Sequence, residues 1–135
     1  MVEAALVASL VVSGVATYYP ADEFSGRPLY CDQFSDRPLT YSESLPPWAA
    51  FDIGWYESGR VRCGDVVLLL FEGGERLTVR AWDSGTFRGY YVNTWPELPI
   101  LADLPEHLRP DGAMAWRVRV VNLSELAEKM GLTGE

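Results

Sequence analysis

The chain has 135 residues, the size of one domain, and its 48% hydrophobic and 13% aromatic residues exclude a disordered chain. Nineteen acidic and eleven basic residues give a formal net charge of -8. This balance argues against nucleic acid and anionic membranes as partners, because basic residues drive binding to both, whereas a neutral polysaccharide is compatible with it.

The chain begins with an apolar stretch, residues 4–12, that is too short to span a bilayer as a helix. It lacks the basic flank of a signal peptide, because the first Lys or Arg is Arg27. We expect the stretch either to prolong the first strand or to pack on a neighbour. Residues 11–19, rich in Val, Thr and Tyr and followed by Pro20, predict that first strand.

Residues 20–47 contain five prolines and predict a long loop, which in a small domain is usually functional or held in place. Cys31, in its middle, is a candidate for the holding point. Cys31 and Cys63 are expected to form a disulfide if the protein is exported, and to be small core residues if it stays in a reducing cytosol. Because His107 is the only histidine, a four-ligand zinc site is not expected, and we predict no metal and no cofactor.

The middle of the chain contains the clearest strand signals. Small and apolar residues in 48–57 suggest a short helix, and the continuous apolar run 66–71 predicts a strand buried on both faces. Residues 72–75, Glu-Gly-Gly-Glu, predict a tight hairpin. We therefore expect the next strand to pair with 66–71.

That next strand ends in a carboxylate. Apolar and larger polar residues alternate over 77–83, so Asp83 is expected to share the core-facing side of the strand with Val79 and Ala81. Two interpretations of Asp83 remain open. It either starts an Asx-type turn with residues 84–85, or it is a functional carboxylate with a raised pKa at the rim of the core.

The last third of the chain is less regular. Residues 89–93 suggest a short strand, and Asp103 has the spacing of an N-cap for a helical turn at 104–108. Residues 115–121 alternate clearly and predict a strand, and Ser124 is expected to cap a short helix that runs to Met130 and is stopped by Gly131. The predicted class is mainly β, with about six strands in a barrel and short peripheral helices.

Three motifs occur in a specific order. Residues 14–19 read Gly-Val-Ala-Thr-Tyr-Tyr, residues 63–64 are Cys-Gly before the apolar strand, and residues 83–87 read Asp-Ser-Gly-Thr-Phe. Together they resemble the double-psi β-barrels of the rare-lipoprotein-A, expansin and barwin group, which have G-x-A-S/T-W/Y-Y, C-G and D-R-G-P-F segments in this order. The resemblance covers residues 14–121 and implies a six-stranded double-psi β-barrel, with an N-terminal apolar extension (1–13) and a short C-terminal helix and tail (122–135).

The resemblance implies a secreted or cell-envelope protein that binds or remodels polysaccharide, such as peptidoglycan or another cell-wall glycan. Some members of the group are lytic transglycosylases, for which Asp83 would be the acid/base here. A second Asp usually follows in an F/I/V-D-L-S segment, and by position Asn93 stands in its place. A neutral amide cannot protonate a leaving oxygen, and ordinary hydrolysis uses two carboxyl groups. Asp52 is the candidate for the second one, whereas Asp65, at a strand start, is expected to face solvent.

The resemblance also directs attention to aromatic residues, because sugar rings stack on aromatic faces while their hydroxyls form hydrogen bonds at the edges. We expect Trp82 and Trp116 to pack on the barrel. The candidate substrate-binding residues are Thr17, Tyr19, Trp48, Trp55, Tyr91, Asn93 and Trp95.

Two further functions remain open. A non-catalytic glycan-binding module needs the aromatic residues but no second acid. A structural or assembly protein, such as a cell-surface or virion component, would keep the barrel without the chemistry, and residues 4–12 would provide a strand for self-association.

Overall fold

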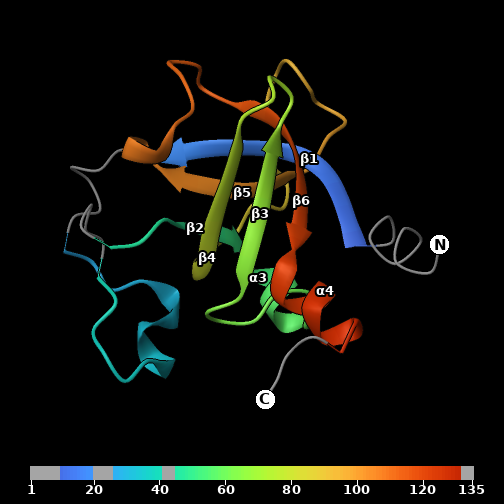
Figure 1. Ribbon diagram of the computed structural model, residues 1–135. Helices are drawn as coiled ribbons and strands as arrows, with labels where there is room; N and C mark the ends of the chain where they lie inside the picture. The colour runs from blue at the N-terminus through green and yellow to red at the C-terminus, as the bar shows by residue number, and fades with distance from the viewer. Residues whose placement is uncertain (1–9, 20–25, 41–44, 132–135) are drawn as a thin grey trace.

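Six strands close into a barrel in the computed structural model, which describes residues 10–19, 26–40 and 45–131 (Figure 1). The strands follow the order β1-β5-β2-β4-β3-β6 around the barrel. Most of the apolar stretch 4–12 lies outside the described residues. The strands are β1 (Val11–Tyr19), β2 (Trp48–Asp52), β3 (Val66–Phe71), β4 (Arg76–Gly85), β5 (Ile100–Pro105) and β6 (Trp116–Asn122).

The connections between strands define the fold. β5 lies between β1 and β2, and β2 lies between β5 and β4, so the β1–β2 and β4–β5 connections each pass over an intervening strand. The pairs β1/β5 and β2/β4 are parallel, and the remaining pairs are antiparallel. Two such interlocked connections in a closed six-stranded barrel make the double-psi β-barrel, as predicted. Closure leaves no strand edge unpaired, which stabilises an all-β domain.

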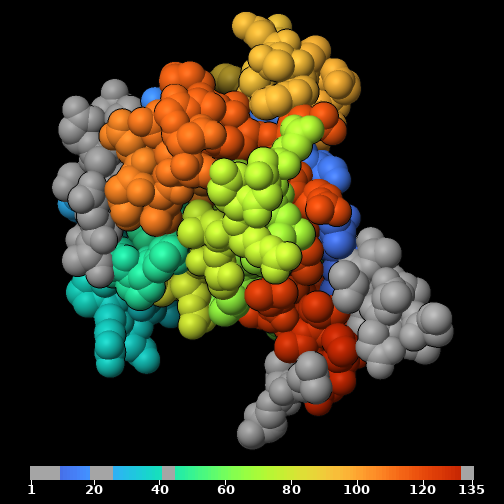
Figure 2. Space-filling model, turned by 45° about the horizontal axis from the view of Figure 1, so that its top comes forward, coloured from blue at the N-terminus to red at the C-terminus, as the bar shows by residue number. Residues whose placement is uncertain are grey.

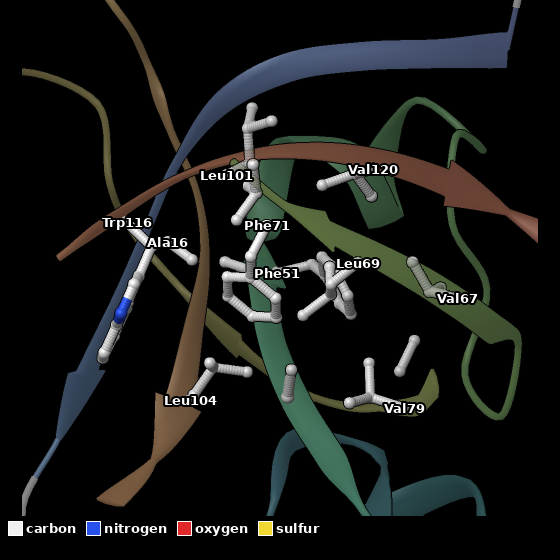
Figure 3. Packing of buried hydrophobic residues seen from close by; sticks show 14 of the residues in the cluster. Ala16, Phe51, Val67, Leu69, Phe71, Val79, Leu101, Leu104, Trp116 and Val120 are labelled. Carbon is white, nitrogen blue, oxygen red and sulfur yellow. The ribbon is translucent and has the colours of Figure 1, made fainter. Parts of the chain in front are cut away.

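Alternating side chains from all six strands fill the barrel (Figure 3). On β3, Val67, Leu69 and Phe71 point inward, while the residues between them are half-buried on the outer side. The expectation that β3 is buried on both faces is therefore wrong, because only the barrel interior covers it. Trp116 packs in the same core, as predicted.

Two bulges interrupt this alternation. On β4, Ala81 pairs with Ala49 but Asp83 pairs with Ala50, so Trp82 is an extra residue. Because Ala49 faces the core and Ala50 faces outward, Asp83 also faces outward. The prediction that Asp83 shares the core-facing side with Ala81 is wrong, since a bulge reverses the side of every residue beyond it.

β5 contains the second bulge. Val15 of β1 pairs with Ile100 and Ala16 with Ala102, which leaves Leu101 as the extra residue. Leu101 and Ala102 both lie in the core. Asp103, the next residue, is therefore on the outer side of the barrel.

Short helical segments complete the fold: η1 (Tyr30–Phe34), α3 (Ile53–Glu57), η2 (Glu106–Leu108) and α4 (Leu123–Lys129). The predicted helix at 48–57 is β2 followed by α3, because the buried β2 residues form a strand between β4 and β5. Residues 89–93 form no strand, and Asp103 is a strand residue and not a helix cap. The hairpin at 72–75 and the short C-terminal helix are confirmed, but Asn122 and not Ser124 is the N-cap of that helix, and the Ser124 hydroxyl accepts the N–H of Val66 instead.

The long loop is held as expected, because a disulfide joins Cys31 to Cys63. Cys31 is buried, and its Sγ lies 3.4 Å from the carbonyl oxygen of Ala81 on β4. The disulfide therefore fixes η1 against the outer side of β4, next to Asp83.

Candidate functional site

A row of residues crosses four strands on the outer side of the barrel. Thr17 of β1 pairs with Asp103 of β5, and Asp103 pairs with Ala50 of β2. Ala50 also pairs with Asp83 of β4. The register therefore places two carboxyl groups on either side of one small residue, with a hydroxyl at the end of the row.

The pKa of the Asp103 carboxyl is raised. Burial raises its pKa to about 6, and the negative charge of Asp83 contributes in the same direction. The Thr17 hydroxyl donates a 2.8 Å hydrogen bond to Oδ1 of Asp103, which lowers the pKa and limits the shift. A carboxyl with this pKa exchanges its proton near neutral pH, as a general acid must.

Asp83 is held by the segment that the disulfide fixes. Its Oδ1 accepts a 2.8 Å hydrogen bond from the main-chain N–H of Tyr30, in η1. The Tyr56 hydroxyl donates to the main-chain carbonyl of Asp83 over 2.7 Å, and burial followed by the charge of Asp83 raises the pKa of Tyr56. The rings of Tyr30 and Tyr56 are in contact, with centroids 4.9 Å apart. Asp83 is thus half-buried and bonded to a distant segment.

Asp52, the predicted second acid, has a structural role. Its Oδ2 accepts the N–H of Gly54 at the start of α3 (2.8 Å), and its Oδ1 accepts the N–H of Phe87 (3.0 Å). Both oxygens are therefore used to join the end of β2 to the segment after β4. Asp65 also differs from expectation: it is buried and accepts hydrogen bonds from the main chain of Arg62 and the side chain of Asn122.

The second carboxyl of the row is Asp103, which the sequence analysis missed. Asn93, expected at the acid position, is exposed in a turn that a bridge between Val92 and Trp95 closes. The sequence does contain a signal for Asp103. Residues 100–104 read Ile-Leu-Ala-Asp-Leu, and their Asp-Leu pair matches the D-L of the expected segment, ten residues further along the chain than Asn93. Asp103 also has the spacing of a helix N-cap, and that interpretation was preferred to a match with the D-L pair.

The predicted substrate-binding aromatics do not gather around the two carboxyls. Trp48 is fully buried, so its predicted place in a groove is wrong. Trp55 and the exposed Tyr91 line a different cleft, of about 560 Å³, at the barrel end where β1 and β5 begin. Trp95 is half-buried in its turn, where its main-chain N–H donates to the Val92 carbonyl. Thr17 belongs to the acid row, and the side chain of Tyr19 lies outside the described residues.

The part of the chain that the structure describes contains neither a metal-ligand cluster nor a helix that could span a membrane. In these residues, no three His, Cys, Asp or Glu side chains are grouped so that they could hold a metal ion. The described helices also include none of the length and apolar character needed to cross a bilayer.

Comparison with known proteins supports the fold. No family model and no curated protein matches the chain. A solved structure, the apo form of the Clavibacter michiganensis expansin, is similar with a TM-score of 0.51 and 20% sequence identity. The similarity covers 82% of this chain and 49% of that one, so the chain spans about half the length of the expansin. The chain has the six-stranded double-psi β-barrel fold of an expansin domain.

Proposed function

We propose that the protein binds a cell-wall polysaccharide over the outer side of β1, β5, β2 and β4 and remodels it, with Asp103 as general acid. The observation that carries this proposal is the pair of carboxyls flanking Ala50, one of which has a pKa of about 6. The expansin-like fold supports a glycan as the ligand. The disulfide supports an extracellular location, since such bonds persist in oxidising compartments.

The two carboxyls have different environments and hence different roles. Asp103, whose pKa is raised by burial, would give its proton to the glycosidic oxygen as the C–O bond breaks. Asp83, whose Oδ1 accepts the Tyr30 N–H, would stabilise positive charge on the sugar. In lytic cleavage a hydroxyl of the same sugar attacks the anomeric carbon and returns a proton to Asp103, which yields an anhydro-sugar end. This assignment moves the acid role from Asp83 to Asp103.

The test is release of anhydro-sugar products from peptidoglycan, measured by mass spectrometry. Asp103→Asn should lower the rate by about 100-fold or more, because general acid catalysis typically contributes that much. Asp36→Asn, an exposed change of the same kind, serves as the control. Full activity of Asp103→Asn would remove this residue from the mechanism.

A binding-only function gives a different pattern in the same experiment. Wild-type protein would then release no product but sediment with insoluble glycan, and Asp103→Asn would sediment less. If the protein neither binds nor cleaves any glycan, the structural or assembly function would be the remaining candidate. The described residues do not specifically favour that function.

A further inference from the structure

Four arginines lie together on the outer side of β4, β3 and β6. Arg76 and Arg119 pair with the same residue, Leu70 of β3, from its two sides. Arg80 lies further along β4, and Arg117 lies two residues before Arg119 on β6. All four side chains are exposed. We call these four residues the arginine face; Figure 2 shows β3 and β4 in yellow-green beside the red of β6.

The charge of this face is opposite to that of the chain. Acidic residues outnumber basic ones by 19 to 11 overall, yet the outward positions of β3, of β6 and of β4 as far as Arg80 include four arginines and no acid; the first outward acid of β4 is Asp83, in the acid row. If this face were merely solvated, acidic residues would be expected at some of its outward positions. These positions are Val66, Leu68, Leu70, Arg76, Thr78, Arg80, Arg117, Arg119 and Val121.

The four arginines differ in their bonding partners. Arg117 lies 3.5 Å from Glu72, and Arg80 donates to the Gly64 carbonyl over 3.0 Å. Arg76 and Arg119 form no ion pair or hydrogen bond through their guanidinium groups with any residue that the structure describes. Their guanidinium groups are therefore available to an external anion.

A cleft accompanies these charges. It has a volume of about 390 Å³, and its lining includes Leu70 of β3, both arginines of β6, and Glu72, whose carboxylate is paired with Arg117. Since neighbouring strands are about 4.8 Å apart, Arg76 and Arg119 leave β4 and β6 at points about 10 Å apart, on either side of Leu70. The surface thus combines the half-buried Leu70 with the two β6 arginines in the cleft and with Arg76 on the neighbouring strand.

The arginine face shares β4 with the acid row, but its other two strands lie on the opposite side of the barrel. In the closed strand order, β3 lies opposite β5 and β6 lies opposite β2. Leu70 and Arg119 are therefore across the barrel from Asp103 and Ala50. A polymer on the arginine face would leave the acid row accessible.

We propose that the arginine face binds a polyuronate, that is, a polysaccharide with one carboxylate on each sugar. Guanidinium groups bind carboxylates through paired hydrogen bonds, and the C–H faces of sugar rings fit the half-buried Leu68 and Leu70. The acidic chain as a whole disfavours nucleic acid. The inference rests on the proposed function in one respect, that the ligand is a wall glycan.

The test is affinity for polygalacturonate, measured by affinity electrophoresis at low and at high salt. Arg76→Gln and Arg119→Gln should each weaken binding about threefold, and the double variant about tenfold, as expected for exposed ion pairs that act together on one polymer. Salt should weaken wild-type binding and have less effect on the double variant. Arg37→Gln, the same charge change at an exposed loop position, should bind like wild type.

Three results would overturn the inference: unchanged affinity of the double variant, equal loss in Arg37→Gln, or equally tight, equally arginine-dependent binding of DNA. Asp103→Asn separates this inference from the proposed function. It should bind polygalacturonate normally, so loss of product release with intact polyuronate binding supports both. Normal product release by the double arginine variant, with polyuronate binding lost, shows that the two sites are independent.

Discussion

Replacing Asp103 by Asn should make the protein more stable at neutral pH, although the same change removes the proposed general acid. The buried carboxyl must ionise at neutral pH in a site that disfavours its charge. An Asn of nearly equal size can still accept the hydrogen bond from the Thr17 hydroxyl. The substitution therefore removes the cost of the charge and keeps the contact.

The magnitude follows from the pKa. The folded-state pKa is about 6, against an ordinary value of 3.8, and each unit is worth 1.36 kcal/mol. The folded state holds the proton more tightly than the unfolded state, so the contribution to the free energy of unfolding is fully present below pH 3.8. It is lost as the pH rises through about 6. Above that pH the loss is about 3 kcal/mol at most, and we expect Asp103→Asn to recover about 1 to 3 kcal/mol.

Urea unfolding at pH 4 and pH 7.5 measures this difference. The stabilisation by Asp103→Asn should appear at the higher pH and nearly vanish at the lower one, while Asp36→Asn should show no such pattern. Asp83→Asn removes a charge that raises the pKa of Asp103, so carbon NMR should report a lower pKa for Asp103 in that variant. A pH-independent effect of Asp103→Asn, or a loss of stability at pH 7.5, would refute the reasoning.

Two other changes test the scaffold. Replacing both Cys31 and Cys63 by Ser opens a loop with a sequence separation of 32. The variant should lose about 4 kcal/mol of unfolding free energy, measured by urea unfolding. An equally stable variant would show that the bond does not hold the loop. Gly14→Ala would place a Cβ 2.5 Å from Leu101 Cγ and 2.6 Å from a main-chain oxygen, and should cost about 1 to 3 kcal/mol. Gly112→Ala, with no atom within 4 Å, is its control and should change thermal unfolding little, so equal losses in both would contradict the packing argument.

The barrel itself was predictable from the sequence because its signals are local. The hairpin at 72–75 and the alternation at 115–121 depend on residues close in the chain. The double-psi arrangement was implied by the resemblance of the three ordered motifs to a known group of barrels, and the disulfide was one of two alternatives that cysteine chemistry allowed.

The acid row depended on tertiary structure. Asp83 and Asp103 come together only because both strands pair with Ala50, and each faces outward only because a bulge precedes it. Strand alternation gives the wrong side for Asp83, since one extra residue in a strand leaves no clear mark in the sequence.

The sequence by itself therefore determined the fold class and one candidate carboxyl, because periodicity and motif order act over short distances. Tertiary structure alone decided which second carboxyl joins Asp83, which aromatic residues are buried, and where the arginines gather. These depend on strand register and barrel closure, which bring together residues that are far apart in the chain, such as Thr17 and Asp103, 86 positions apart.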